Sequence, residues 1–192
     1  MTQVLQTVLW RGINRPGIEY CTLSQTEVSY QLVGAALSAI DLVPLQVKYQ
    51  IQCDKEWRTQ NVRVETDLGP TQRELNIHVD RQQRWWLNDA EFVPLRGCID
   101  IDLGITPATN TLPIRRLSLQ VGGHVEITAV WIKFPKLTVQ PLVQRYTRLT
   151  ERRYRYKSLA SSFTVEIQVD EFGMVTNYPG LWKRVAAVRG RS

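Results

Sequence analysis

Apolar and polar residues alternate with a period of two along much of the chain. In segment 45–52, Leu, Val, Tyr and Ile alternate with Gln and Lys, and segments 75–80 and 163–169 repeat this pattern. The alternation predicts strands with one buried and one solvated face, because successive side chains of a strand point to opposite sides. About a dozen or more such segments, separated by Gly, Pro and Asp, predict an all-β, mainly antiparallel fold.

One short helix is expected near residues 110–117. Asn110 and Thr111 are residue types that cap helix N-termini, and Pro113 would lie in the first turn, where its missing N–H costs little. We expect this helix to give way directly to a strand over residues 117–121.

Two other segments carry local signals. Gly122 and Gly123 stand between 117–121 and 124–130, and this arrangement predicts a β-hairpin. Segment 32–40 is rich in small residues and fits either a short helix or a closely packed strand.

The bulk composition is that of a soluble globular protein. The chain has 192 residues, of which 43% are hydrophobic and 22% are charged, so we expect a single domain over residues 1–192. No apolar run approaches the ~18 residues of a membrane helix, and the N-terminus lacks the pattern of a signal peptide.

Cys21, Cys53 and Cys98 are far apart, which favours reduced thiols and a cytoplasmic protein. The Cys and His spacing predicts no metal site, and no cofactor motif is present.

The net charge of +6 is concentrated in two segments. Residues 145–157 hold six cations and one acid, and the last ten residues hold four cations and no acid. We expect residues from about 185 to 192 to form a basic tail in solvent, because charge runs usually lie in water.

The segment 97–117, GCIDIDLGITPATNTLPIRRL, gathers acids, a polar turn and an Arg pair. On a strand, Asp100 and Asp102 would point to the same face. Buried carboxylates need partners, so we expect Arg115 or Arg116 within salt-bridge distance of one of them. The expected members of this structural polar cluster are Asp100, Asp102, Thr109, Asn110, Arg115 and Arg116.

The same segment, with GCIDIDL followed by TPATNTLPIRRL, resembles the bacterial "putative glycolipid-binding" family. Further matching stretches are FPKLTVQPLVQRYTR at 134–148, YRYKS at 154–158 and VDEFGMVTNYPGLWKR at 169–184. The resemblance implies a spiral β-roll, in which a many-stranded sheet wraps around one short helix. It also implies a homodimer and a non-enzymatic role in binding a lipid or glycolipid.

A lipid ligand would need an apolar channel with polar groups at its mouth. Strand alternation in 153–157 places the tyrosines on one face and the cations on the other, and one of the adjacent Trp85 and Trp86 should be exposed. We expect the apolar part of the ligand on the concave side of the sheet and its headgroup near residues 145–157. The expected ligand-binding residues are Arg145, Tyr146, Tyr154, Arg155, Tyr156 and Trp86.

Two other functional classes stay open at this point. A hydrolase acting on a sugar or phosphate ester could use Asp100 and Asp102 as a carboxylate pair, although no nucleophile accompanied by a base is recognisable, so an enzyme is the less favoured class. A scaffold binding RNA or protein could use the two basic segments. Nucleic acid is the less favoured partner, because aromatic and cationic side chains do not share one face.

Overall fold

The computed structural model describes residues 1–190, and its fold is a single sheet of 15 strands. The strand order is β8-β7-β6-β5-β4-β3-β2-β1-β15-β14-β13-β12-β11-β10-β9, so the last strand of the chain pairs with the first. Neighbours are antiparallel except for β9 and β10, which run parallel. The predicted all-β, mainly antiparallel fold with one short helix is confirmed.

The first half of the sheet consists of long strands and a short hairpin, namely β1 (Gln3–Gly12), β2 (Gly17–Gln25), β3 (Tyr30–Ile40), β4 (Val43–Cys53), β5 (Thr59–Leu68), β6 (Thr71–Val79), β7 (Trp85–Leu87) and β8 (Ala90–Glu91). The crossing segment contains η1 (Val93–Leu95), β9 (Ile101–Leu103), η2 (Ala108–Asn110) and the helix α1 (Thr111–Leu117). The second half consists of β10 (His124–Lys133), β11 (Thr138–Thr150), β12 (Arg153–Ser158), β13 (Thr164–Val169), β14 (Val175–Tyr178) and β15 (Trp182–Arg189).

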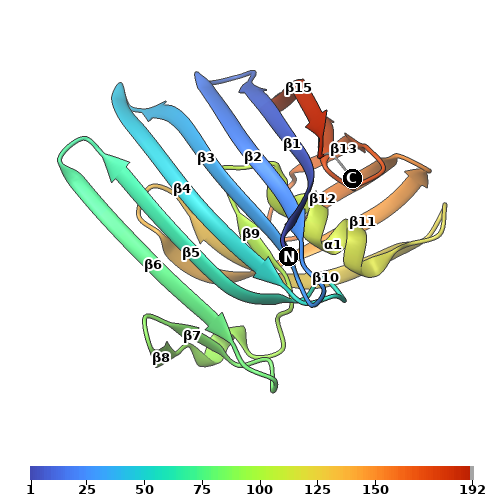
Figure 1. Ribbon diagram of the computed structural model, residues 1–192, viewed down its shortest axis with the longest axis horizontal. Helices are drawn as coiled ribbons and strands as arrows, with labels where there is room; N and C mark the ends of the chain where they lie inside the picture. The colour runs from blue at the N-terminus through green and yellow to red at the C-terminus, as the bar shows by residue number, and fades with distance from the viewer. Residues whose placement is uncertain (191–192) are drawn as a thin grey trace.

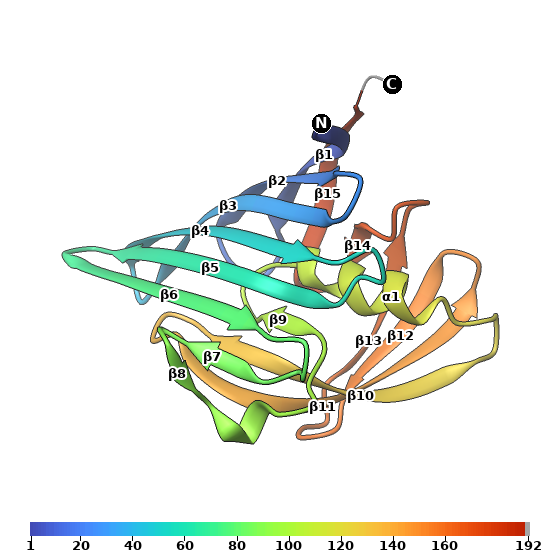
Figure 2. The same cartoon turned by 60° about the horizontal axis from the view of Figure 1, so that its bottom comes forward.

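The sheet curves until its two halves face each other. Strands β1 to β6 form one wall, β10 to β13 form the other, and α1 lies in the space between them (Figures 1 and 2). The outer surface of the first wall faces solvent. Within the described residues, no helix is long and apolar enough to cross a membrane.

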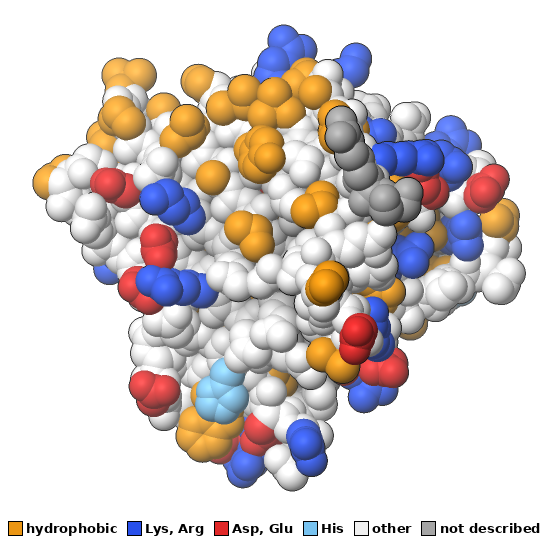
Figure 3. Space-filling view, in the orientation of Figure 1, with side chains coloured by type: hydrophobic (Ala, Val, Ile, Leu, Met, Phe, Trp, Pro, Cys, Tyr) orange, Lys and Arg blue, Asp and Glu red, His pale blue; other side chains and the backbone are white. Residues whose placement is uncertain are grey.

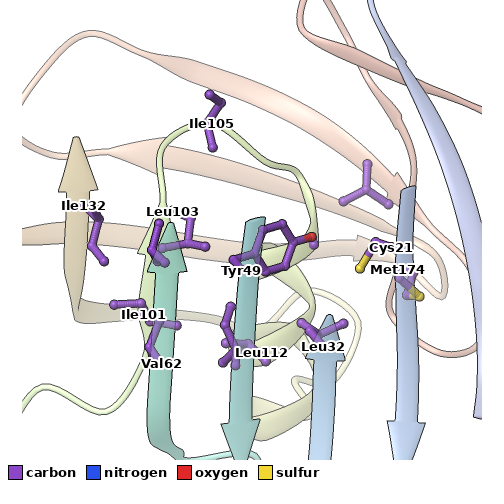
Figure 4. Packing of buried hydrophobic residues seen from close by; sticks show 14 of the residues in the cluster. Cys21, Leu32, Tyr49, Val62, Ile101, Leu103, Ile105, Leu112, Ile132 and Met174 are labelled. Atoms are coloured by element: carbon purple, nitrogen blue, oxygen red, sulfur yellow. The ribbon is translucent and has the colours of Figure 1, made fainter. Parts of the chain in front are cut away.

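Side chains fill the space between the two walls. Leu112 of α1 packs beneath Tyr49 and close to Leu32 and Val62 of the first wall (Figure 4). All four are at most 3% exposed. The concave side around α1 is therefore filled by the protein's own core, and this part of it has no room for a lipid.

The ambiguous segment 32–40 is strand β3. Its Gly34 faces the ring of Tyr49 on the neighbouring strand, and a Cβ at this position would lie 2.2 Å from the ring carbon Cζ. The small residue allows Tyr49 to cross the strand and reach the interior, so close packing explains why this part of the strand lacks bulky residues.

The chain around α1 differs from the expectation in three ways. Residues 118–120 form no strand, and Gly122 and Gly123 do not turn a hairpin between paired strands. Instead the Gly122 N–H donates to the carbonyl of Arg148, and the Arg148 N–H donates to the carbonyl of Gly123. These long-range bonds replace the expected local pairing. The side chain of Asn110 also makes no cap hydrogen bond to the helix.

The described part of the expected basic tail at 185–192 belongs to the fold. Residues 185–189 belong to β15, and Val188 and Arg189 pair with Thr7 and Gln6 of β1. This pairing joins the two halves of the sheet. Residues 191 and 192 lie outside the described part of the chain.

Candidate functional site

The Asp100 carboxylate forms a buried ion pair with Arg116 of α1. Arg116 Nε donates to Asp100 Oδ1 at 3.0 Å, and Nη2 donates to Oδ2 at 2.6 Å. Burial raises the pKa of Asp100, and the guanidinium opposes this rise. The salt bridge expected from the sequence is present, and it ties α1 to the strand that precedes it.

The other residues of the expected polar cluster do not form one group in the structure. Arg115 is exposed, donates to the Glu171 carbonyl at 3.3 Å, and lies over the ring of Trp57. The hydroxyl of Thr109 accepts from the Leu103 N–H at 3.4 Å. The side chain of Asn110 donates to the Pro107 carbonyl at 3.2 Å. These contacts fix the turn between β9 and α1.

Asp102, by contrast, lines an open cleft. Gln144 Nε2 donates to its Oδ2 at 2.6 Å, and no ion pair to Asp102 is found among residues 1–190. Burial raises the pKa of Asp102 to about 6, partly opposed by the Gln144 hydrogen bond. The two aspartates therefore have different surroundings, since a guanidinium binds Asp100 and an amide binds Asp102.

We call this cleft the Asp102 cleft; its volume is about 500 Å³. It lies between the β1–β2 turn and side chains of β9 to β12, β14 and β15. Its lining consists of Asn14, Arg15, Asp102, Leu103, Gly104, Thr106, Asn110, Trp131, Leu142, Tyr156, Ser158, Ser161, Phe163, Tyr178, Leu181 and Trp182. The size is that of a typical small-molecule site, and the lining mixes aromatic rings with a few polar groups, as such sites do.

A chain of hydrogen bonds supports the polar floor of the cleft. Gln144, which is 1% exposed, holds Asp102, and the neighbouring Tyr146 donates its hydroxyl proton to Asn110 Oδ1 at 3.1 Å. Asp102 and Asn110 are thus held from behind by side chains of β11. A floor fixed in this way can present hydrogen-bonding groups to a ligand without first reorganising.

A third acid with a pKa raised by burial lies directly behind the cleft wall. Tyr49 and Thr106 both donate to Glu19 Oε1 at 2.5 Å, while Glu19 Oε2 is buried without a partner among the described residues. Burial raises the pKa of Glu19 to about 7, opposed by these two hydrogen bonds. Thr106 is the link between this carboxyl and the Asp102 cleft.

The residues expected to bind a ligand do not come together. Of the three tyrosines, Tyr156 lines the cleft, Tyr146 lies behind its floor, and Tyr154 lies beside a different pocket with Arg148 and Arg152. All three are buried, as strand alternation predicts.

Arg145 and Arg155 point away from the tyrosines. Each forms an ion pair with an acid on the adjacent strand, Arg145 with Glu126 and Arg155 with Glu166. They do not line the Asp102 cleft. The expected headgroup site at 145–157 therefore divides into an inward aromatic side and an outward, charge-paired side.

Trp86 of β7 is half-buried and Trp85 is fully buried, so neither member of the pair is as exposed as expected. The Trp86 ring is parallel to that of His78 on β6, with centroids 5.7 Å apart. It borders a separate polar groove that includes Asn61 and Asn88. This groove does not share a lining residue with the Asp102 cleft.

Sequence reasoning missed several residues of the cleft. Trp131 is the cross-strand neighbour of Asp102, and Trp182 and Tyr178 pair with each other at the β14–β15 turn. Arg15 comes from the β1–β2 turn at the other end of the sequence. Alternation could place each strand residue on an inward face, but only the pairing of β15 with β1 brings these segments together.

The chemistry available in the cleft is hydrogen bonding and aromatic contact. A two-carboxylate mechanism would need Asp100 beside Asp102, but both oxygens of Asp100 are engaged by Arg116 and the residue does not line the cleft. Within residues 1–190, no group of three or more His, Cys, Asp and Glu side chains could hold a metal ion.

The pH dependence of stability is expected to report the burial of Asp102. In the folded protein its pKa is about 6, above the ordinary value of 3.8. The protein is therefore most stable below pH 4 with respect to this group, and its free energy of unfolding falls as the pH rises from about 4 to 6. We expect Asp102→Asn to raise the free energy of unfolding at pH 8 by roughly 1–2 kcal/mol, since part of the side chain faces the open cleft. Urea unfolding at pH 5 and pH 8 measures the effect, with Asp89→Asn in an exposed turn as control. An Asp102→Asn protein with no stability gain at pH 8 would contradict this account.

Comparisons with known proteins agree with the fold and the sequence pattern. The family model described as "Putative glycolipid-binding" matches residues 7–184. A crystal structure of a DUF1089 family protein from Pseudomonas aeruginosa is similar, with 32% sequence identity and a TM-score of 0.77, over 87% of this chain and 92% of that one. No match is found among curated proteins. A match over nearly the whole chain shows that the protein belongs to the "Putative glycolipid-binding" family.

Proposed function

We propose that the Asp102 cleft binds the headgroup of a glycolipid and catalyses no reaction. The observation that carries this proposal is the lining, in which Trp131, Tyr156 and Trp182 surround the polar groups of Asp102 and Asn110. Aromatic rings offer apolar faces to the C–H surfaces of a sugar, and buried polar groups select its hydroxyls. The family name supports the same class of ligand.

The position of Asp102 favours a sugar over an anionic headgroup. Its carboxylate can accept hydrogen bonds from hydroxyl groups, and such charge-assisted bonds are stronger than neutral ones. Arg15 is the single cation among the residues that line the cleft. A volume of about 500 Å³ suits a headgroup and the adjoining part of the lipid rather than two complete acyl chains.

Trp131→Ala is the direct test of this assignment. We expect the variant to bind a short-chain alkyl glycoside at least about 10-fold more weakly, because a buried aromatic contact contributes about 1.5–3 kcal/mol. Isothermal titration calorimetry below the micelle concentration measures the affinity, and short-chain phosphatidylcholine serves as the ligand without a sugar. Trp86→Ala is the matched variant outside the cleft and should bind as the unchanged protein does. Loss of binding in Trp86→Ala alone would instead place the binding site in the separate polar groove beside Trp86.

The basic surface of β11 and β12 does not favour a nucleic-acid function. Arg145, Arg152 and Arg155 are each paired with a glutamate. Arg148 donates to backbone carbonyls, and the exposed Arg153 and Lys157 are the two cations of this run outside these contacts. A phosphate backbone is bound by several unpaired Lys and Arg side chains, and two such residues do not favour this alternative over the Asp102 cleft.

We also propose a cytoplasmic homodimer. The thiols of Cys21, Cys53 and Cys98 are free and buried, which supports a reducing compartment. The middle of the outer sheet surface carries the exposed Tyr20 and Val33 on adjacent strands, at 56% and 42% exposure. Such a patch supports a contact between two copies, as expected from the family resemblance.

A further inference from the structure

The turn between β3 and β4 ends in an exposed leucine. Leu42 is 98% exposed and has a φ of 66°, and Asp41 before it has a φ of 50°. Tight hairpin turns with two positive φ values favour Asn, Asp and Gly, which adopt this conformation at low cost. A leucine is strained at a positive φ, and its side chain is exposed to water here at a free-energy cost. The stability of the fold therefore does not explain why residue 42 is a leucine.

Other exposed apolar side chains surround Leu42 at the same end of the sheet. Ile18 and Leu37 are cross-strand neighbours, and they are 43% and 50% exposed. Val43 adjoins Leu42, and Ile13 lies in the neighbouring β1–β2 turn. We call these five residues the apolar edge. Hydrophobic side chains gather along the upper margin of Figure 3, over the ends of β1 to β4.

The apolar edge continues into cations and into the mouth of the Asp102 cleft. Arg11 pairs across the sheet with Ile18 on one side and with Lys183 on the other. Arg15, two residues beyond Ile13, lines the cleft. The turn that carries part of the edge therefore also forms the rim of the candidate ligand site.

We propose that the apolar edge docks on the surface of an anionic phospholipid membrane, with Leu42 inserted among the lipids. Projecting apolar residues flanked by Lys and Arg are the chemistry of interfacial membrane binding. Docking in this way places the cleft mouth at the level of the lipid headgroups. A cleft sized for a headgroup could then hold it while the acyl chains stay in the bilayer. The purpose of docking rests on the proposed function, but the docking itself does not require a glycolipid.

A membrane suits this edge better than a second copy of the chain. The most exposed side chain is at the tip of a turn, and the others lie on a second turn and on the strand ends between the two turns. Ile18 and Leu37 adjoin the outer patch of Tyr20 and Val33, so the proposed contact between copies would lie beside the apolar edge. A protein interface needs a broad complementary surface, whereas a bilayer accepts isolated side chains. Asp41 is the acid within the turn, and Arg11, Arg15 and Lys183 outnumber it.

The test is co-sedimentation of the full chain with vesicles of phosphatidylcholine and phosphatidylglycerol that contain no glycolipid. We expect Leu42→Asn to lower the partition coefficient by roughly 10- to 100-fold, because insertion of a leucine side chain is lost. Asn is favourable in the turn, so the thermal unfolding temperature of this variant should be equal or higher. A loss of binding cannot then be attributed to misfolding.

Two control variants separate docking from ligand binding. Val28, which is 74% exposed, lies in the turn at the opposite end of β3, and Val28→Asn should bind vesicles as the unchanged protein does. Trp131→Ala should also keep vesicle binding, since its effect is confined to the cleft. If Trp131→Ala keeps vesicle binding while no glycoside binding is found in any variant, the proposed function fails and docking stands.

Two results would overturn docking. One is an unchanged protein that does not sediment with the vesicles, and the other is a Leu42→Asn variant that sediments equally well. In the first case, a Leu42→Asn variant that changes from dimer to monomer in analytical ultracentrifugation would assign the apolar edge to a second copy of the chain.

Discussion

Replacing Arg116 with Ala is expected to lower the free energy of unfolding by about 3–5 kcal/mol. Asp100 is 1% exposed, and Arg116 binds both of its carboxylate oxygens. Without the guanidinium, a buried carboxylate has no counter-charge and must either remain unpaired or take up a proton. Burial already raises its pKa, so protonation is the expected outcome and the variant should recover part of its stability at low pH.

Arg115→Ala is the matched control, because it removes the adjacent cation of the same helix. Arg115 is exposed and its contacts lie at the surface, so we expect a loss below about 1 kcal/mol. Chemical denaturation at pH 7 compares the two variants. Equal losses, or a loss below about 1 kcal/mol for Arg116→Ala, would contradict a structural role for the ion pair. The segment 97–117 would then lose its assignment as scaffold.

Gly34→Ala is expected to cost about 3 kcal/mol or more, although it adds a single methyl group. The new Cβ would lie 2.2 Å from Cζ and 2.3 Å from Oη of Tyr49, well inside van der Waals contact. Overfilled cores usually lose about 1–3 kcal/mol. Displacing Tyr49 also breaks its 2.5 Å hydrogen bond to buried Glu19, which adds the cost of an unsatisfied polar group.

The control for Gly34→Ala lies one residue away on the same strand. Ala35 faces the outer side of the sheet and is half-buried, so Ala35→Val adds more volume where solvent provides room. Its effect should stay within about 0.5 kcal/mol. Differential scanning calorimetry of both variants tests the comparison. A Gly34→Ala protein as stable as the unchanged one would contradict this prediction. It would show that the Tyr49 ring can shift at no cost, and that its hydrogen bond to Glu19 does not stabilise the fold.

Local pattern predicted the strands well because side-chain alternation is a local property. Leu45, Val47, Tyr49 and Ile51 are all at most 3% exposed, as their spacing indicates. The hairpin at Gly122 was wrong because its N–H bonds to Arg148, a partner far along the chain. Such a partner depends on the order of strands in the sheet, which local alternation does not determine.

The candidate site was harder to predict than the fold. Strand alternation separated Tyr156 from Arg155 correctly, but it could not show that Glu166 on the next strand neutralises Arg155. It also treated Asp100 and Asp102 as equivalent, although the strand begins between them and only Asp102 reaches the cleft. The cleft itself forms where the first and last strands meet, and no local pattern predicts that closure.

Native mass spectrometry of the protein purified from its own host tests the central claim most directly. The account predicts a bound glycolipid on the unchanged protein and its loss in Trp131→Ala, with the fold retained and Trp86→Ala still loaded. Detection of the lipid on both tryptophan variants, or of no lipid on the unchanged protein at any collision energy, would contradict the assignment of the Asp102 cleft as a glycolipid site.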